Sequence, residues 1–273
     1  MDILNKVKCL HFYISVFTLL LLVSTNVIAQ TAVDSTRIFS VLSFNIYHGE
    51  TVNAVKKYDL DLLAKVINDT KPDLVALQEV DFKTNRARKY DLVTELGQRT
   101  KMQAIFGKAM SYDGGEYGEG VLSKYSFLST KNHPLIAQEG KEPRAALEVN
   151  VALKSGDTIR FVGTHLDHTK EDTDRINQAR QLNELFTKDD TPTILAGDLN
   201  SRPESEAMKI LFQYWKPSLP DFEPTAPANN PRSKIDYVLF RPLHKWKVLD
   251  AEIICDDMVT DHCVVLSILE LLN

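Results

Sequence analysis

The stretch that most constrains the fold is TILAGDLNSRP, which runs from Thr193 to Pro203. Its first half is a short apolar run without charge, the pattern of a strand that is buried on both faces. Asp198 and Asn200 follow, two residues apart. Alternate residues of an extended chain point the same way, so both side chains are predicted to face one site at the strand's carboxyl end, where open α/β sheets bind ligands. Taken alone, the stretch fits an ordinary Asp/Asn turn equally well.

Other apolar runs in the chain end in the same way, and they alternate with runs of helical periodicity. This alternation predicts a layered α/β domain. Asp59 is expected to begin one helix and Ser205 to cap another, and residues 173–186 have the pattern of a third. The polar residues at the strand ends are Asn45, Glu79, His165, Asp198, Asn200, Asp236, Asp261 and His262.

These strand-end residues indicate a metal-dependent chemistry. Carboxylates that converge repel one another unless a cation lies among them. Oxygen ligands suit hard divalent ions, so Mg²⁺ is the expected cofactor, with Mn²⁺ or Ca²⁺ as alternatives. Histidines beside such a site suit proton transfer or contact with an anionic group. Together these residue types predict metal-assisted hydrolysis of a phosphate ester.

Residues 1–29 have the pattern of a signal peptide. Lys6 and Lys8 precede an apolar stretch at 10–23, and a cleavage site is predicted after Ala29. An uncleaved anchor is the alternative, but polar residues interrupt the stretch before it reaches the roughly 20 apolar residues that span a bilayer. We therefore expect an exported, monomeric protein, periplasmic or extracellular, with one domain at 30–273 and no transmembrane segment after cleavage.

Charge and cysteine usage limit the partners. The chain has a formal net charge of −5, which argues against a protein that binds long nucleic acid through a basic face. Nucleic acid is therefore not the favoured substrate, although an enzyme that binds a few phosphates locally is compatible with this charge. Export permits a disulfide between Cys255 and Cys263, but we expect two thiols in separate core strands.

Three further positions are candidates for substrate binding. Residues 83–89 carry four cations in seven positions, a pattern typical of a solvated loop. The alternative is a phosphate-facing rim that includes Arg86. Arg144 is expected either to lie in solvent or to contact a phosphate, and His48 follows shortly after the strand end at Asn45.

Other features favour structural roles. The Gly-rich stretch 112–120 is expected to form a flexible surface loop, and His133 and His244 to be surface residues. His168 could join His165 in a transition-metal site, but the many oxygen ligands nearby favour a harder ion.

Six short motifs occur in order along the chain, and their combination is highly specific. They are Ser43-Phe44-Asn45, Leu77-Gln78-Glu79, Thr164-His165-Leu166, Gly197-Asp198-Leu199-Asn200, Ile235-Asp236-Tyr237 and Asp261-His262. Through them the chain resembles the endonuclease/exonuclease/phosphatase superfamily, which includes pancreatic deoxyribonuclease, abasic-site endonucleases, neutral sphingomyelinases and inositol-polyphosphate phosphatases. The resemblance runs from about Arg37 to Leu269. It implies a four-layer α/β sandwich, in which two mixed β-sheets lie face to face with helices on the outside.

The resemblance also implies a metal site. Asn45 and Glu79 resemble the principal metal ligands of the family, with Asp261 as a third. Two residues depart from the broad family pattern: many relatives have Asn or a small residue in place of Glu119, and His48 resembles the mark of a bacterial subgroup. These departures leave the substrate open.

For catalysis, the resemblance implies in-line attack of water on phosphorus. Asp198 resembles the group that orients or deprotonates this water, and Asn200 the group that holds it in place. His165 and His262 resemble donors to the phosphoryl oxygens, where charge grows in the transition state. Asp236 resembles the carboxylate that orients His262.

The expected function is thus that of a metal-dependent phosphoesterase. Its substrate is a phosphodiester or a phosphomonoester, such as a phospholipid head group, a small phosphodiester or a nucleic acid. An extracellular nuclease is one alternative. A catalytically silent binding module with the same fold is another, but every motif residue is present in this chain.

Overall fold

The computed structural model describes residues 35–52, 58–221 and 223–273. The signal peptide expected at 1–29 lies outside the described residues and stays a prediction. Within the described part of the chain, no helix combines the length and the apolar character that crossing a membrane requires.

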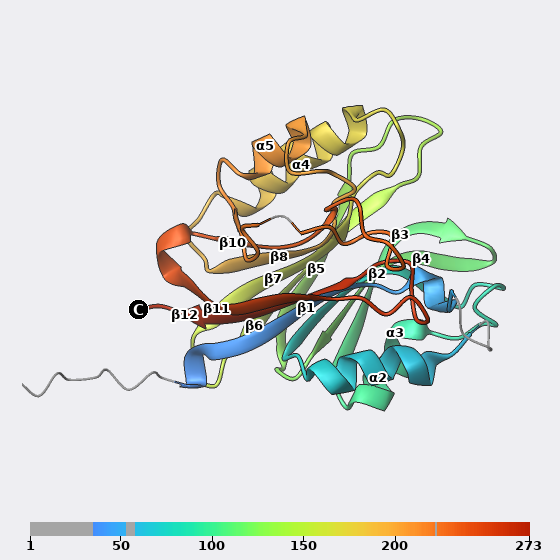
Figure 1. The fold of residues 1–273 in the computed structure, drawn as a ribbon, viewed down its shortest axis with the longest axis horizontal. Coiled ribbons are helices and arrows are strands. Elements are labelled where there is room, and N and C mark those ends of the chain that lie inside the picture. The colour runs from blue at the N-terminus through green and yellow to red at the C-terminus, as the bar shows by residue number, and fades with distance from the viewer. Residues whose placement is uncertain (1–34, 53–57, 222) are drawn as a thin grey trace, which may run out of the picture. The chain divides into compact units, whose positions relative to one another are not determined.

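Two six-stranded sheets form the unit Ser35–Asn273 (Figure 1). The first sheet has the order β11-β12-β1-β2-β4-β3, and its strands are β1 (Ile38–Asn45), β2 (Leu74–Phe82), β3 (Gln103–Tyr112), β4 (Gly115–Ser123), β11 (Trp246–Ile254) and β12 (Val264–Leu271). The second has the order β5-β6-β7-β8-β10-β9, and its strands are β5 (Phe127–Leu135), β6 (Arg144–Ala152), β7 (Thr158–His165), β8 (Thr193–Asp198), β9 (Lys216–Pro217) and β10 (Asp236–Arg241). Each sheet contains one parallel pair, β1 with β2 and β7 with β8, so both sheets are mixed.

The sheets face each other, and helices cover their outer sides. Val41 points into the core between the sheets, whereas its neighbour Leu42 packs under the helices, because successive strand residues point to opposite faces. The helices are α2 (Leu60–Thr70) and α3 (Leu92–Thr100) on the first sheet and α4 (Thr173–Phe186) and α5 (Glu206–Leu211) on the second, with short 3-10 turns at Ser35–Arg37, Tyr47–Gly49 and Leu243–Lys245. The predicted four-layer α/β sandwich is confirmed.

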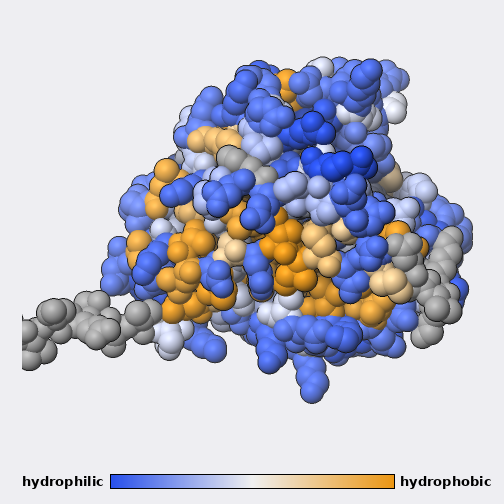
Figure 2. Space-filling model, viewed as in Figure 1, coloured by the Kyte–Doolittle hydropathy of each residue, from blue (hydrophilic) through white to orange (hydrophobic). Residues whose placement is uncertain are grey.

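The outer layers are polar. Figure 2 shows hydrophilic residues over the helical layers and hydrophobic residues gathered between them, over the sheets. The helices begin as predicted: the side chain of Asp59 accepts a hydrogen bond from the Leu62 N–H, and Ser205 accepts one from the Met208 N–H. Such caps satisfy N–H groups that have no partner inside the helix.

Strand register brings the polar strand ends to one edge of the sandwich. Asp198 at the end of β8 lies opposite His165 at the end of β7 and opposite Asp236 at the start of β10. In the other sheet, β12 runs antiparallel to β1, so the residues before β12 lie beside the end of β1 at Asn45. The predicted convergence of strand ends therefore occurs.

The prediction of a flexible surface loop at 112–120 is wrong. Tyr112 ends β3, and most of this stretch belongs to β4. Its glycines are needed for close backbone contact: a Cβ on Gly118 would lie 2.0 Å from the Gly107 carbonyl oxygen, and one on Gly115 would lie 2.4 Å from that of Phe82. A dense run of Gly here marks tight packing within a sheet.

Two other expectations are corrected. Cys255 and Cys263 form a disulfide, because both lie just beyond the paired ends of β11 and β12, where the strands hold them opposite each other. They are not thiols in separate strands. His133 is buried rather than on the surface, and its Nε2 lies 2.7 Å from a carboxylate oxygen of Glu148. His244 is exposed, as expected.

Candidate active site

A cleft of about 380 Å³ opens at the edge where the strand ends meet. Residues of both sheets line it, including Glu79, His165, Asp198, Asn200 and His262. The sequence-predicted candidates are thus brought together, although they are spread from Asn45 to His262 in the chain.

Asp198 is the most connected carboxylate of the cleft. The backbone N–H of Asn200 donates to its Oδ1 (2.9 Å), and the Asn45 amide donates to its Oδ2 (3.2 Å). The Nε2 atoms of His165 and His262 lie 3.4 and 3.8 Å from the same Oδ2. Burial, followed by the negative charge of Asp236, raises the pKa of Asp198. A buried carboxylate with a raised pKa has the proton affinity of a general base.

Asn200 faces the same site as Asp198, but not in the way expected. Its φ of 46° is left-handed, so the chain turns sharply after Asp198 instead of continuing as a strand. The turn is stabilised by the hydrogen bond from the Asn200 N–H to Asp198, which is the local bond that makes Asp common in turns. The Asn200 amide then donates to the Leu166 carbonyl (3.0 Å), which holds its side chain in the cleft.

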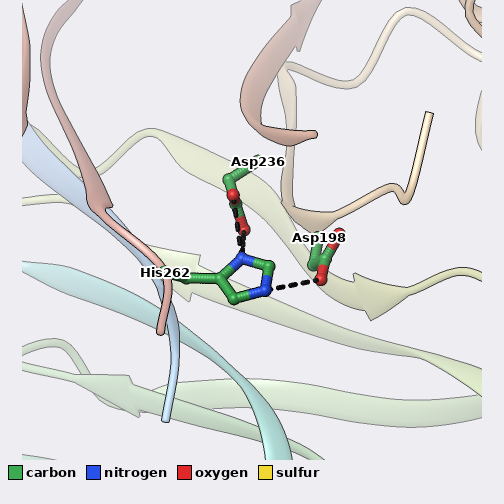
Figure 3. A group of neighbouring side chains, drawn as sticks. All are labelled: Asp198, Asp236 and His262. Carbon is green, nitrogen blue, oxygen red and sulfur yellow. Dashed lines mark hydrogen bonds and ion pairs between the residues drawn. The ribbon is translucent and has the colours of Figure 1, made fainter. Parts of the chain in front are cut away.

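His262 is held between two carboxylates (Figure 3). Its Nδ1 lies 3.1 and 3.0 Å from the two carboxylate oxygens of Asp236, and its Nε2 points toward Asp198. Burial opposes a charge on the ring, but Asp236 and Asp198 outweigh it and raise the pKa of His262. The ligand atoms of these three residues lie within 4.8 Å of one another and could hold a metal. Since Asp236 already uses Nδ1, the group is better explained as an imidazolium between two carboxylates.

Asn45 and Glu79 form the other half of the centre. The Asn45 amide donates to Glu79 Oε1 (3.0 Å) as well as to Asp198, so its N–H₂ lies where two acidic groups converge. Burial opposes ionisation of Glu79, but hydrogen bonds from His48 and Asn45 outweigh it and lower its pKa. Glu79 has a φ of 58° at a bulge in β2, and such a strained conformation in a non-glycine residue often marks a functional position.

The donor set fits a hard divalent cation. Asp261 supports this, because its buried Oδ1 has no hydrogen-bond partner among the described residues. Burial raises the pKa of Asp261 although the charge of His262 opposes the rise, so a cation beside this carboxylate would favour its ionised form. An ionised Glu79 and the Asp261 carboxylate are oxygen donors of the kind that Mg²⁺, Mn²⁺ and Ca²⁺ prefer. The Asn45 oxygen accepts from the Tyr47 N–H (3.1 Å), and because an amide oxygen has two lone pairs, Asn45 would bind the cation through the second one.

His165 and Asn200 present two N–H groups to the cleft. The guanidinium of Arg144 donates to Nδ1 of His165 (3.0 Å), so the proton of the neutral ring lies on Nε2. The Asn200 Nδ2 atom lies 2.9 Å from this Nε2. Two donors cannot hydrogen-bond to each other, so an acceptor oxygen that binds beside both nitrogens would satisfy them, and the pair is suited to a phosphoryl oxygen.

The remaining predicted substrate residues differ in position. His48 lines the cleft, and its Nδ1 lies 3.3 Å from Glu79. Arg86 also lines the cleft, whereas Arg88 lies over Tyr58 in a separate pocket. The solvent position expected for Arg144 is wrong: its side chain is 2% exposed.

Five residues of the cleft wall were not among the site residues predicted from the sequence: Met110, Tyr112, Tyr117, Glu142 and His168, of which His168 was considered only as a transition-metal ligand. His168 had a signal, since it follows His165 by three residues. The tyrosines had none, because they lie in the stretch expected to be a flexible loop. Glu119, the departure from the family pattern, is fully buried behind this wall, and burial raises its pKa while the charge of Arg144 opposes the rise.

A four-layer α/β sandwich with acidic, amide and histidine side chains at one edge defines a class of hydrolases that act on phosphate esters. The chain belongs to the endonuclease/exonuclease/phosphatase family, whose model matches residues 42–262. Members of this family are phosphoester hydrolases.

Solved structures share the fold. An endonuclease/exonuclease/phosphatase protein from Beutenbergia cavernae superposes with a TM-score of 0.73 at 22% identity, over 87% of this chain and 72% of that one. A mannosyl-6-phosphatase of Bacteroides thetaiotaomicron gives 0.65 at 17% identity, over 85% and 99%. D. rerio TDP2, in complex with a single-stranded DNA product, gives 0.67 at 19% identity, over 85% and 99%. At these identities the likeness concerns the fold.

Proposed function

We propose that this protein is an exported phosphoesterase that depends on a divalent cation, with Mg²⁺ as the leading candidate. The observation that carries the proposal is the surroundings of Asp198, where an amide, two imidazoles and a second acidic group converge on one buried carboxylate. Groups in such a cluster perturb one another's proton affinities, which is typical of catalytic sites.

Asn45, Glu79 and Asp261 would hold the cation, which supplies positive charge to a phosphoryl or leaving oxygen. The protein's own residues account for the rest. Asp198 orients a water and accepts its proton, a role that its raised pKa favours.

Donors of the cleft stabilise the charge that develops on the phosphoryl group. His165 donates from Nε2, and Asn200 donates from Nδ2 or holds the attacking water. His262 is kept protonated and oriented by Asp236, so it offers a charged N–H to the phosphoryl oxygens. All three donors are fixed by hydrogen bonds before substrate binds, which is the condition for electrostatic stabilisation of a transition state.

A small phosphate ester is the substrate class that we favour. The relatives include both a mannosyl-6-phosphatase and a protein bound to a DNA product, so the fold serves both monoesters and nucleic acid. The net charge of −5 disfavours tracking along a polyanion. An extracellular nuclease remains the second candidate, because of the resemblance in fold to the DNA-bound relative.

One assay separates these functions. The protein is incubated with Mg²⁺ and, in parallel, with p-nitrophenyl phosphate, bis-p-nitrophenyl phosphate, mannose 6-phosphate, sphingomyelin and plasmid DNA. We expect turnover of a small ester that stops with a chelator and returns when Mg²⁺ is restored. Plasmid nicking at low enzyme concentration would favour the nuclease, and turnover of none of them would favour a silent binding module. Turnover that a chelator leaves unchanged would contradict metal dependence.

Export and a monomeric state complete the proposal. Mass spectrometry of the secreted protein should give an N-terminus at Gln30, and size-exclusion chromatography with light scattering should give a monomer. Retention of residues 1–29 would contradict the predicted cleavage.

A further inference from the structure

Arg144 connects two histidines of the cleft. It is the first residue of β6, and its side chain is 2% exposed. Nη1 lies 3.0 Å from Nδ1 of His165, and Nη2 lies 3.0 Å from Nδ1 of His168. Glu142 balances the charge, with a carboxylate oxygen 3.1 Å from Nη1. One buried guanidinium therefore holds two imidazole rings by the same ring atom.

This contact decides where both histidines carry their protons. A guanidinium is always protonated and has no acceptor, so both Nδ1 atoms must accept. A neutral imidazole has one ring proton, which is then on Nε2 in both residues.

His168 gains a donor that the proposed mechanism does not use. The residue is exposed and lines the cleft, and its Nε2 is on the opposite side of the ring from the bond to Arg144. In the described part of the chain, this Nε2 has no hydrogen-bond partner. His165, the other ring on the same guanidinium, is buried among the catalytic groups. His168 is thus placed on the solvent side of the donor that faces the phosphoryl group.

We propose that His168 binds an oxygen of the alcohol part of the substrate through Nε2–H, and that Arg144 is the positioning residue that gives both His165 and His168 this tautomer. The inference rests on the proposed function and narrows it. The substrate class is a phosphate ester whose alcohol carries a further acceptor oxygen close to the ester bond, as in a sugar or polyol phosphate.

The first test uses two substitutions that mimic different ring nitrogens. His168→Gln places an amide N–H near the position of Nε2, whereas His168→Asn keeps only an acceptor near Nδ1. On mannose 6-phosphate we expect His168→Asn to lower kcat/KM about tenfold, mainly through KM, which is the loss of one hydrogen bond. His168→Gln should stay within about threefold of the wild type. His244→Gln, an exposed histidine outside the cleft, is the matched control.

The substrate gives a second control. p-Nitrophenyl phosphate has no hydroxyl oxygen near its ester bond. The kcat/KM on mannose 6-phosphate divided by that on p-nitrophenyl phosphate should therefore fall about tenfold in His168→Asn and stay within about threefold of the wild-type ratio in His168→Gln. Equal losses for His168→Gln and His168→Asn on mannose 6-phosphate, or no loss for either, would overturn the role of His168. If the wild type hydrolyses neither ester with a divalent metal, the proposed function fails, and the tautomers are still measurable.

The second test needs no activity. Nitrogen NMR of the wild-type protein labelled with ¹⁵N-histidine reports which ring nitrogen carries the proton. In the wild type we expect His165 and His168 to be protonated on Nε2 and unprotonated on Nδ1. In Arg144→Met we expect a mixture of the two tautomers for His168. A proton on Nδ1 of either ring in the wild type would refute the role of Arg144, whether or not the Arg144 variant folds.

Discussion

Two walls of the same cleft are built by different means. The catalytic wall consists of strand-end residues whose charges act on one another, as Asp198, His262 and Asp236 do. A second part of the lining, here called the Arg86 wall, consists of Arg86, Tyr112 and Tyr117, and the buried Asp81 supports it. Its charges are already paired, since Arg86 forms two hydrogen bonds of 2.7 and 2.9 Å with the buried carboxylate of Asp81.

The Arg86 wall is rigid through contacts between distant segments. The guanidinium of Arg86 lies 4.6 Å from the ring centroid of Tyr112 and 5.6 Å from that of Tyr117. The backbone N–H of Arg86 donates to Asp113 at the turn between β3 and β4 (2.7 Å), and the Asn85 amide donates to the same carboxylate. Among the described residues, Nη1 of Arg86 has no hydrogen-bond partner, so a donor is left for substrate.

This difference between the two walls indicates that the catalytic wall carries out the reaction and that the Arg86 wall selects the substrate. An uncompensated charge is costly to bury, so buried charges of this kind are found mainly where they take part in a reaction. A paired, stacked arginine adds little to the field of the cleft but offers N–H groups in a fixed geometry. We therefore expect changes in the catalytic wall to lower kcat and changes in the Arg86 wall to raise KM.

The largest effect should come from the catalytic wall. Asp198→Ala and His262→Ala should each lower kcat at least about a hundredfold, the scale of a lost general base or transition-state donor. KM should change little, and steady-state kinetics on p-nitrophenyl phosphate measures both. Circular dichroism confirms that each variant folds. A folded variant with the wild-type rate would remove that residue from the mechanism.

The disulfide should matter next, because it closes the loop that contains Asp261 and His262. Cys255→Ser together with Cys263→Ser should lower the free energy of unfolding by about 2 kcal/mol through the greater freedom of the unfolded chain. It should lower kcat by up to about tenfold, because His262 loses its fixed position. Thermal unfolding and kinetics with and without reductant measure both effects. If KM rose while kcat stayed constant, the loop would not serve the catalytic wall.

In the Arg86 wall, Arg86→Gln should raise KM about fivefold for an ester that carries a second anionic group, because one charge-assisted hydrogen bond is lost. The kcat value should not change. Arg88→Gln is the matched control: Arg88 is in the same loop but lies over Tyr58 in another pocket. An equal rise of KM in both variants would show a general effect of charge. If KM rose in neither variant, the loop at 83–89 would not bind substrate.

The smallest effect should come from Tyr112. Tyr112→Ala removes the ring on which Arg86 stacks, and it should raise KM by about twofold to fivefold, the scale of a partly exposed cation–π contact. Tyr112→Phe keeps the ring and should behave as the wild type. The same substrate with a second anionic group is used for both. A loss in Tyr112→Phe would mean that the hydroxyl, not the stacking, supports the wall.

Much of the catalytic wall could be predicted from local sequence. Apolar runs that stop at Asn45, His165 or Asp198 predict strands with polar ends, and strands of one sheet share an edge. The role of each residue came from the six ordered motifs. The tertiary structure explains why these residues meet: strand register places His165 and Asp236 on either side of Asp198.

The Arg86 wall and the position of Arg144 could not be predicted in this way. Arg86 meets Tyr112 and Asp113 across 26 and 27 residues, and nothing in the run of cations at 83–89 distinguishes Arg86 from Arg88. The glycines at 112–120 indicated flexibility, because glycine permits loops and close packing alike. Arg144 begins a strand, and only the fold places two imidazoles in front of it.

The sequence by itself determined the layered α/β class, the strand ends and the set of acidic, amide and histidine groups that suit a phosphate ester and a hard cation. Periodicity and local hydrogen bonding act over a few residues, so short segments of the sequence are enough to predict these features. Only the tertiary structure decided which charges are left uncompensated, which arginines are paired or buried, and which ring nitrogens carry protons. Those properties depend on burial and on partners that are far apart in the chain, and burial changes the free energy of a charge more than any neighbour in sequence does.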